Sequence, residues 1–322
     1  MERVEIAQAF SKILDDAKML EKELMELGGE NNVYSGPKVV AYAATRNRYS
    51  QMERSAKMLI ANGNIDKIYF LVKDDVYPNK LPDIIETINV SNQNYFAPYS
   101  PNVNSPWTHM AFMRLAFHKL FPDLDRILWL DTDTLIVDDI SKLFETPLNE
   151  YYYFGAVKEN LRYIQYLDIR KIETKETAYD AYPQTEHQDY YNSGVLLENL
   201  KLLRESGIGD RLISYINNYR SYYPDQNIIN QLCRNRIFTL SHEYNWSYFT
   251  GDTGIPRIIH TSCGKPRPEI QLIIDMYEKL SFDDVMNFKN GNKIKPLLSN
   301  SSEVLEADEI VEANQSGGVH WN

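Results

Sequence analysis

The chain has 322 residues, of which 43% are hydrophobic, enough for one large domain or two small ones. A net charge of −11 argues against nucleic acid as a partner, and no stretch approaches the roughly 20 apolar residues that span a bilayer. With only two cysteines and a charged first segment that lacks an apolar signal core, we expect a cytoplasmic protein.

The first 28 residues carry apolar side chains at alternating spacings of four and three, which predicts an amphipathic helix with a heptad seam. These apolar positions are Ile6, Phe10, Ile13, Ala17, Leu20, Leu24 and Leu27. Gly28 and Gly29 follow and would end the helix. Residues 1–30 are therefore expected to form a separate unit, which either packs on its own domain or associates with a second copy through residues 6–27.

Residues 37–282 form the body of the chain, in which strands and helices are expected to alternate. Strands are expected at Val39–Ala44, at Ile68–Val72, from Arg126, at Tyr151–Val157, at Gly194–Leu197, at Ile237–Leu240 and at Arg257–Ile259. Helical segments are expected at Ser50–Asn62, Asn79–Thr87, Met110–Leu120, Lys201–Tyr219 and Asp225–Leu232. This alternation predicts a largely parallel α/β sandwich. Residues 283–322 are polar and acidic, and we expect them to form a C-terminal extension.

Two aspartates one residue apart follow the strand that begins at Arg126. Leu128, Trp129 and Leu130 form an unbroken apolar run typical of a buried central strand, and Asp131 and Asp133 come directly after it. The carboxyl end of such a strand lies at the crevice where open α/β sheets bind ligands. Adjacent carboxylates repel each other unless a cation lies between them, and their hard oxygens suit Mg²⁺ or Mn²⁺. The alternative is a surface turn with solvated aspartates.

Six short motifs now stand in a fixed order along the chain. They are Ala43-Ala44-Thr45-Arg46-Asn47-Arg48-Tyr49, Phe112-Met113-Arg114-Leu115, Asp131-Thr132-Asp133, Tyr191-Asn192-Ser193-Gly194-Val195-Leu196-Leu197, Pro224-Asp225-Gln226-Asn227-Ile228-Ile229-Asn230 and Ile258-Ile259-His260. Over roughly residues 38–270 this set resembles the family 8 glycosyltransferases, which include glycogenin and bacterial lipopolysaccharide galactosyltransferases. The resemblance implies a GT-A fold, which is Rossmann-like, a UDP-sugar donor, Mn²⁺ as the metal and retention of anomeric configuration.

The resemblance also implies a role for individual residues. Asp131 and Asp133 match the family's metal-binding pair, and His260 matches the third protein ligand. The remaining matches concern the donor and the reacting carbon. Ala43, Thr45 and Tyr49 match the segment that holds uracil, Arg114, Thr132, Asn192 and Ser193 match positions around the donor sugar, and Asp225 and Gln226 match the pair beside the anomeric carbon. Structural roles compete with three of these assignments, because Arg114 can pair with the aspartates, His260 can be a core histidine and Asp225 can cap a helix.

Two positions depart from the family pattern. Asn227 follows Asp225-Gln226 where many relatives have a second Asp, which removes a charge without removing hydrogen bonding. The second departure follows His260. The family's His-x-x-Gly-x-x-Lys-Pro-Trp is replaced by His260-Thr261-Ser262-Cys263-Gly264-Lys265-Pro266-Arg267. Lys265 therefore arrives one residue early, and no tryptophan follows it. The resemblance still implies that Lys265 reaches the diphosphate, although on a different spacing.

The resulting hypothesis is a retaining, metal-dependent hexosyltransferase that uses a UDP-sugar and a glycan or glycoconjugate acceptor. A self-glucosylating protein like glycogenin is one alternative. A nucleotidyltransferase is another, but it predicts a glycine-rich basic loop after the first strand, and Ala43–Tyr49 contains no glycine. A glycan-binding protein without activity is a third, against which the intact metal motif argues. Retention is expected to proceed by front-side attack, with Asp225 as the only carboxylate placed for double displacement.

Overall fold

The computed structural model describes residues 34–103, 108–159, 189–221, 223–247, 254–262 and 266–291. Its strands are β1 Val39–Ala43, β2 Lys67–Val72, β3 Ile85–Asn89, β4 Arg126–Leu130, β5 Thr134–Ile136, β6 Phe154–Lys158, β7 Tyr191–Asn199, β8 Ile237–Thr239 and β9 Ile258–His260. Its helices are α2 Tyr49–Asn62, α3 His109–Phe112, α4 Phe117–Leu120, α6 Leu200–Glu205, α7 Ile208–Asn218, α8 Pro224–Leu232, α9 Pro268–Lys279 and α10 Phe282–Gly291. Short 3-10 turns lie at Arg46–Arg48, Met113–Ala116, Ser141–Glu145 and His242–Asn245.

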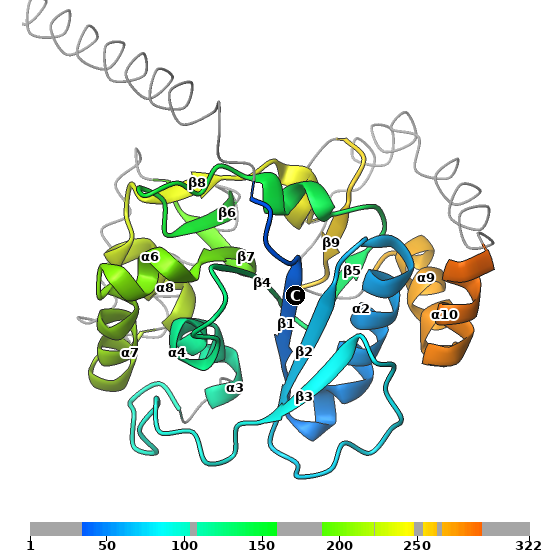
Figure 1. The fold of residues 1–322 in the computed structure, drawn as a ribbon, viewed down its shortest axis with the longest axis horizontal. Coiled ribbons are helices and arrows are strands. Elements are labelled where there is room, and N and C mark those ends of the chain that lie inside the picture. The colour runs from blue at the N-terminus through cyan, green and yellow to red at the C-terminus, as the bar shows by residue number, and fades with distance from the viewer. Residues whose placement is uncertain are drawn as a thin grey trace, which may run out of the picture.

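Seven strands form the central sheet in the order β3-β2-β1-β4-β7-β6-β8, and β5 and β9 form a second, two-stranded sheet (Figure 1). Strands β3, β2, β1 and β4 are parallel, which agrees with the prediction for β2, β1 and β4. Strand β7 runs antiparallel to both β4 and β6, whereas β8 is parallel to β6. The sheet is therefore mixed, and the expectation of a largely parallel sheet holds only for the half that contains β1.

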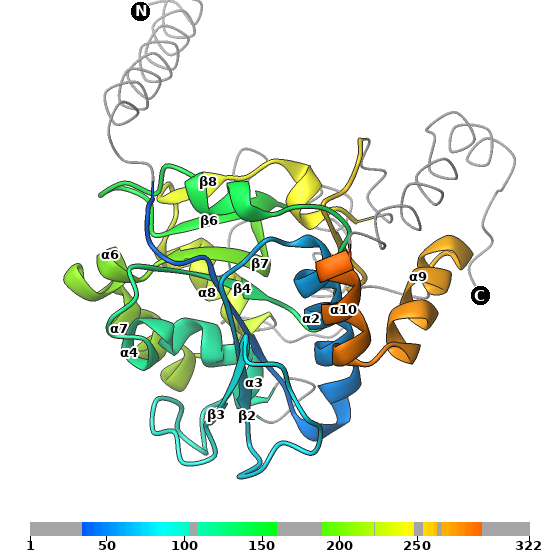
Figure 2. The same ribbon diagram turned by 45° about the vertical axis from the view of Figure 1, so that its right-hand side comes forward.

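Helices cover both faces of this sheet, with α2, α9 and α10 on one side and α3, α4, α6, α7 and α8 on the other (Figure 2). Successive residues of β4 point to opposite faces, so Leu128 and Leu130 belong to the core under α2, while Ile127 and Trp129 belong to the second core. All five residues of β4 are buried, which explains why its sequence shows no polar alternation. The predicted α/β sandwich is confirmed.

The helical turn expected at Asn79–Thr87 is wrong. Residues Ile85–Asn89 form β3, which pairs in parallel with β2 at the edge of the sheet. Pro78 and Pro82 interrupt the segment before it, and the β-branched residues that follow favour a strand. The long helix expected at Lys201–Tyr219 is likewise two helices, because Gly207 between α6 and α7 has a φ of 69°, in the left-handed region.

The carboxyl-terminal helices of the described chain pack on α2. Phe282 and Val285 of α10 are buried in the same core cluster as Met52 of α2, so the polar extension expected from residue 283 begins inside a packed helix. Residues 1–33 and 292–322 lie outside the described ranges, and with them the expected N-terminal helix and the acidic tail. The division into three units therefore stays a prediction.

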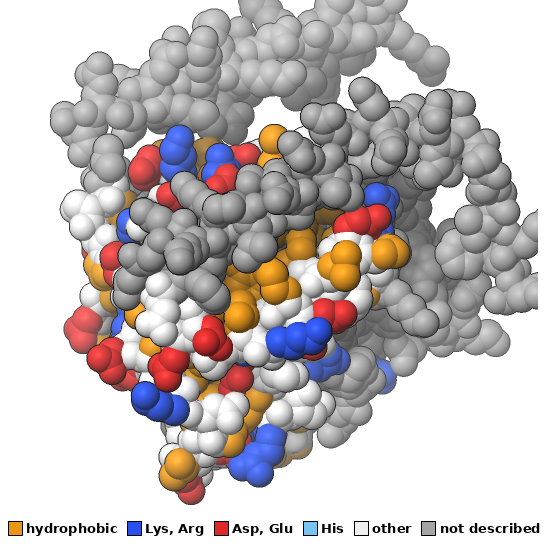
Figure 3. All heavy atoms as spheres, turned by 90° about the vertical axis from the view of Figure 1, so that its right-hand side faces the viewer, with side chains coloured by type: hydrophobic (Ala, Val, Ile, Leu, Met, Phe, Trp, Pro, Cys, Tyr) orange, Lys and Arg blue, Asp and Glu red, His pale blue; other side chains and the backbone are white. Residues whose placement is uncertain are grey.

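Figure 3 shows the face of the molecule that lies to the right in Figure 1. On the described part of this face, hydrophobic side chains lie between acidic and basic ones. Leu272 of α9 is the most exposed large apolar residue of this helix, at 70%. Among the described residues, no helix combines the length and the apolar character needed to cross a membrane.

Candidate active site at the carboxyl edge of the sheet

The antiparallel direction of β7 brings its first residues to the carboxyl ends of β1 and β4. Asp131, directly after β4, donates its backbone N–H to the carbonyl of Gly194 over 2.8 Å. Asn192 and Ser193 therefore lie beside the acidic pair, although they are far from it in sequence. A strand that enters the sheet at this edge contributes polar residues at its start, just as the parallel strands contribute them after their ends.

The short strands β5 and β9 place His260 next to Asp133. In their antiparallel register Thr134 lies opposite His260, so Asp133, one residue earlier, lies at the side of the imidazole. The carbonyl of Asp133 accepts hydrogen bonds from both the backbone N–H and the hydroxyl of Thr261, over 3.1 and 2.8 Å. These contacts fix the turn that carries the second aspartate.

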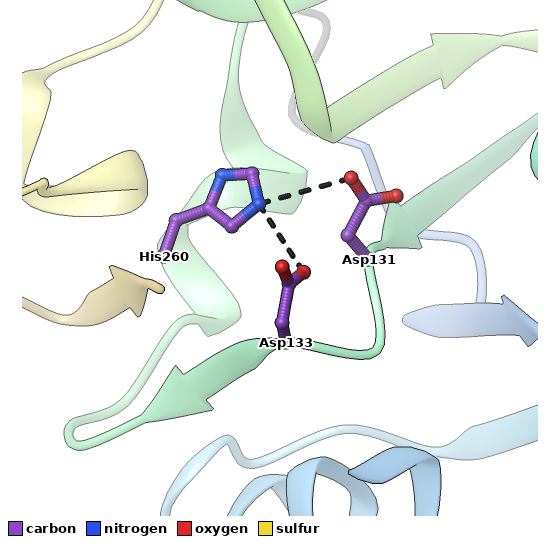
Figure 4. Close-up of side chains that lie close together, drawn as sticks. All are labelled: Asp131, Asp133 and His260. Atoms are coloured by element: carbon purple, nitrogen blue, oxygen red, sulfur yellow. Dashed lines mark ion pairs between the residues drawn. The ribbon is translucent and has the colours of Figure 1, made fainter. Parts of the chain in front are cut away.

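Asp131, Asp133 and His260 converge on one point (Figure 4). The Nε2 atom of His260 lies 3.3 Å from Oδ1 of Asp133 and 3.7 Å from Oδ2 of Asp131. One ligand atom from each residue lies within 4.8 Å of the other two. The three groups that the sequence motif and the resemblance assigned to metal binding are therefore brought together.

The charges of these three groups are strongly linked. Burial raises the pKa of Asp131, the charge of Asp133 adds to this, and the Arg114 guanidinium opposes it. For Asp133 burial acts in the same direction, but the neighbouring imidazole outweighs it and lowers the pKa. Burial alone would lower the pKa of His260, yet the two carboxylates raise it. Two acids that share one base in this way show a local excess of negative charge, which favours a cation.

The imidazole nitrogen that faces the carboxylates is available for a metal. Nε2 of His260 is buried and has no hydrogen-bond partner among the described residues, while the ring as a whole is only 4% exposed. Gly194 allows this placement, because a Cβ at that position would lie 2.1 Å from Cε1 of the ring. Two carboxylate oxygens and an unpaired imidazole nitrogen match the ligands that Mn²⁺ accepts.

Arg114 connects the acidic pair to the start of β7 and to α8. Its side chain is 5% exposed and lies 2.7 Å from Oδ1 of Asp131 and 3.3 Å from Oδ2 of Asp225. It also donates to the carbonyl of Ser193 and stacks over the ring of Trp129, 4.2 Å from its centroid. The structural pairing considered for Arg114 is present, and it reaches two carboxylates at once.

Trp129 has a polar role at this site that the sequence reading missed. Its indole N–H donates to Oδ1 of Asp131 over 2.8 Å, the same oxygen that Arg114 contacts. This carboxylate oxygen therefore has two donors, and the other oxygen, Oδ2, faces His260. The two donors orient Asp131 so that one oxygen stays free for a ligand.

Asp225 and Gln226 lie in the first turn of α8 and contact Ser193. The hydroxyl of Ser193 donates to Oδ2 of Asp225 over 2.9 Å, and its backbone N–H donates to Oε1 of Gln226 over 3.0 Å. The amide of Gln226 donates in turn to the hydroxyl of Tyr190 over 3.1 Å. Tyr190 is fully buried and was not expected from the sequence. Asp225 makes no side-chain cap, because the N-cap position of α8 is Tyr223.

The segment assigned to the nucleotide follows β1 and lies beside β4. Ala43 ends β1, Thr45 is partly exposed, and Tyr49 begins α2. The Tyr49 hydroxyl donates to Asp74 over 2.6 Å, and its ring lies 4.8 Å from that of Tyr77. One face of the Tyr49 ring is therefore already packed, and its stacking on a base stays a prediction. Thr132 is partly exposed between the two aspartates, and Lys265 lies outside the described residues.

A buried carboxyl group lies behind this site. Glu198 of β7 is opposite Ile127 of β4 and Phe154 of β6, and its side chain is fully buried. Neither carboxylate oxygen has a hydrogen-bond partner within the described ranges. Burial raises the pKa of Glu198 well above its usual value, and the charge of Arg114 offsets this only in part. Burial therefore favours the protonated form of this side chain.

Glu198 should make the protein less stable as the pH rises. A carboxyl whose pKa is higher in the folded state contributes stability that is complete below the pKa of the unfolded chain, about 4.3 for glutamate, and is lost above it. We expect Glu198→Gln to raise the melting temperature by at least about 2 °C near neutral pH, with no difference at acidic pH. Glu86→Gln, on the exposed face of β3, is the control and should show no such trend. Equal melting curves for Glu198→Gln and the parent at every pH would contradict the expectation.

The architecture is that of the GT-A glycosyltransferases: a half of parallel strands, an antiparallel strand beside it and an acidic pair at their common edge. The chain belongs to glycosyl transferase family 8, whose profile matches residues 39–263. The family and the fold expected from the ordered motifs are thus confirmed.

The individual relatives share between 18% and 28% sequence identity with this chain. The chain is 28% identical over 222 residues to the lipopolysaccharide 1,2-glucosyltransferase of Escherichia coli K12, covering 65% of this chain and 62% of that protein. The solved galactosyltransferase LgtC, in complex with donor and acceptor sugar analogues, matches with a TM-score of 0.54 and 18% identity over 76% of this chain and 96% of that one. The glycosyltransferase GlyE of Streptococcus pneumoniae TIGR4 matches with a TM-score of 0.57 and 19% identity over 80% and 64%. At these identities the solved structures establish the fold alone.

Proposed function

We propose that the protein transfers a hexose from a UDP-sugar to a glycan or glycoconjugate, with a divalent metal and with retention of configuration. The observation that carries the proposal is the convergence of Asp131, Asp133 and the unpaired Nε2 of His260 at the carboxyl edge of the sheet. Membership of the family supports sugar transfer, and the names of the relatives point to glycan acceptors of the lipopolysaccharide kind. A cytoplasmic location agrees with this role and remains a prediction.

In this proposal Asp131, Asp133 and His260 hold the cation, for which Mn²⁺ is the first choice and Mg²⁺ the second. Once bound, such a cation supplies Lewis-acid stabilisation for the negative charge of the leaving diphosphate. The chain prepares the site by orienting Asp131 through Arg114 and Trp129, so that the carboxylate does not have to reorganise during the reaction.

Ser193, Asp225 and Gln226 form the proposed reacting edge. The oxocarbenium-like sugar is cationic in the transition state, so the Asp225 carboxylate and the Gln226 amide oxygen would both favour it. Oδ2 of Asp225 already accepts from Ser193 and lies 3.3 Å from Arg114. An oxygen engaged in this way is a poor nucleophile. This favours front-side attack, in which the leaving phosphate takes the acceptor proton, over double displacement, which would have to use Oδ1 of Asp225.

Sugar-nucleotide hydrolysis provides the direct test of this function. The purified chain would be incubated with a panel of UDP-hexoses, with GDP- and ADP-hexoses as controls, in Mn²⁺ and in chelator, and nucleotide release measured. We expect release from at least one UDP-hexose in Mn²⁺ and none in chelator. Intact mass measurement in the same samples would detect the self-glucosylation alternative as a mass increase. Equal release in chelator, or release only from other nucleotides, would overturn the proposal.

Gln226→Ala should lower the turnover number of that reaction by at least about 10-fold while changing donor affinity little, because the amide oxygen acts mainly as charge develops at the anomeric carbon. Gln231→Ala provides the matched control, since Gln231 lies on the same helix but is exposed. Steady-state kinetics on both variants separate the turnover number from the Michaelis constant. An unchanged turnover number would exclude Gln226 from the reacting edge and leave Asp225 as the candidate.

A further inference from the structure

The second nitrogen of the His260 imidazole contacts an asparagine on the opposite side from the carboxylates. Nδ1 of His260 lies 3.0 Å from Oδ1 of Asn245, which ends the 3-10 turn His242–Asn245. Asn245 is 7% exposed, and its backbone is held close to β9, because the next residue, Trp246, pairs with Ile259. The imidazole is therefore held from behind by a buried side chain that does not itself face the metal site.

Asn245 is the middle of a longer hydrogen-bonded chain. Its amide nitrogen donates to Oδ1 of Asn192 over 2.8 Å, and Asn192 donates in turn to the carboxylate of Glu159 over 2.8 Å. The backbone N–H of Gly194 also donates to Oδ1 of Asn192 over 2.8 Å. The series runs from Glu159 through Asn192 and Asn245 to His260, and so links four separate parts of the chain.

The donor-to-acceptor direction of these hydrogen bonds is determined at the Glu159 end of the series. An ionised carboxylate only accepts hydrogen bonds, so the side-chain nitrogen of Asn192 must face Glu159. A backbone N–H only donates, so the side-chain oxygen of Asn192 must face Gly194. That oxygen must then accept from the nitrogen of Asn245. The oxygen of Asn245 consequently faces His260, and an oxygen there requires a proton on Nδ1.

We infer that Asn245 is a positioning residue, which holds His260 with a proton on Nδ1 and an open lone pair on Nε2, and that Asn192 and Glu159 impose this direction on Asn245. The inference rests on the proposed metal site. It accounts for a buried Nε2 that has no hydrogen-bond partner among the described residues although it lies 3.3 and 3.7 Å from the two carboxylates, because only this tautomer leaves Nε2 a lone pair for a cation bound between them. A histidine that ligates a metal commonly donates its other N–H to an oxygen that orients it.

Asn192 thereby gains a role besides any contact with the donor sugar. The start of β7 contacts both the metal-binding side and the reacting edge of the proposed site. The Asn192 side chain acts on His260 through Asn245, and the neighbouring Ser193 contacts Asp225 and Gln226. The orientation of the imidazole and the arrangement of the reacting edge thus depend on the same two residues.

Metal affinity tests the inference independently of catalysis. Titrating Mn²⁺ into the full chain with UDP present, followed by electron paramagnetic resonance, should show affinity about 10-fold weaker for Asn245→Ala, the loss expected when the partner of a ligating histidine is removed. Asn102→Ala is the matched control, a buried asparagine that bonds the carbonyls of Ile216 and Tyr219 away from the site. It should lose stability while keeping its Mn²⁺ affinity.

Asn245→Asp separates orientation from stability. The carboxylate keeps an acceptor for Nδ1–H but sets an oxygen against the oxygen of Asn192, so this variant should be less stable while its Mn²⁺ affinity stays within about 3-fold of the parent. If Asn245→Asp weakens Mn²⁺ binding as much as Asn245→Ala, an oxygen that accepts from Nδ1–H is not what holds the imidazole, and the inference fails.

Nitrogen NMR reads the tautomer directly. In protein labelled with ¹⁵N-histidine and loaded with diamagnetic Zn²⁺, the His260 signals, assigned with His260→Gln, should show a metal-bound Nε2 and the proton on Nδ1 in the parent. Asn245→Ala should show a larger share of unligated His260 at the same Zn²⁺ concentration. A parent with the proton on Nε2 would overturn the inference. If the parent binds no metal at all, the proposed function fails; if it binds metal and Asn245→Ala binds equally well, only the inference fails.

Discussion

Replacing Asp133 by asparagine is expected to lower sugar transfer by at least about 100-fold, because the change removes a charged group from the proposed metal site and from the electrostatic stabilisation of the leaving group. Asp133 is the carboxylate nearer to Nε2 of His260, at 3.3 Å. The asparagine has nearly the same shape, and the backbone contacts of the turn with Thr261 remain. Activity should therefore fall without loss of the fold, as circular dichroism and transfer assays on one preparation would show.

Asp123→Asn controls for the change in net charge. Asp123 is exposed and lies before β4, at the opposite end of the strand that leads to the acidic pair. This variant should keep full activity and Mn²⁺ affinity. If Asp133→Asn retained the metal-dependent activity of the parent, the acidic pair would be no more than the solvated turn considered at the outset.

Replacing Arg114 by methionine is expected to destabilise the protein by about 3 kcal/mol at neutral pH, since breaking a buried ion pair leaves an uncompensated charge. Two carboxylates lose their partner in this case, Asp131 at 2.7 Å and Asp225 at 3.3 Å, and the stacking on Trp129 changes as well. Urea unfolding in chelator would measure the loss. Transfer activity should fall too, because the orientation of Asp131 depends on this arginine.

The pH dependence of that loss distinguishes charge from packing. The pKa of Asp131 is already raised by burial, and Arg114 opposes this, so its removal raises the pKa further. A carboxyl of this kind costs stability only above the pKa of the unfolded chain, near 3.9 for aspartate, so the deficit of Arg114→Met should shrink as the pH falls towards 4. Arg126→Met removes a buried arginine whose hydrogen bonds within the described ranges go to backbone carbonyls and whose guanidinium lies over the Tyr34 ring. Its deficit should be independent of pH. Equal pH profiles for the two variants would refute the charge explanation.

The sequence was sufficient to predict the parts of the fold that have a regular pattern. The apolar run of β4, the amphipathic α2 and the aspartates after a buried strand all follow from local periodicity. The parallel half of the sheet and the position of the acidic pair could therefore be predicted, and the ordered motifs pointed to the family.

Pairings between distant segments were beyond the reach of that reasoning. Strands β5 and β9 have three residues each, too short for a recognisable period, yet their register is what sets His260 beside Asp133. Tyr190 and Asn245 are single polar residues in buried surroundings, and nothing in their neighbours marks them. The antiparallel direction of β7 likewise follows from tertiary packing, because a buried strand reads alike in either direction.

The two-stranded sheet also affects when the site can form during synthesis. The aspartates emerge from the ribosome long before the histidine, because Thr261, the residue after His260, is 128 positions beyond Asp133. A nascent chain that stops before residue 260 presents two carboxylates without their imidazole, and it lacks the strand that pairs with β5. Because amino-terminal parts of a chain fold first, the parallel half of the sheet can assemble early, while the proposed cation site would be complete only with β9. Metal loading would thus report that nearly the whole catalytic unit has been made.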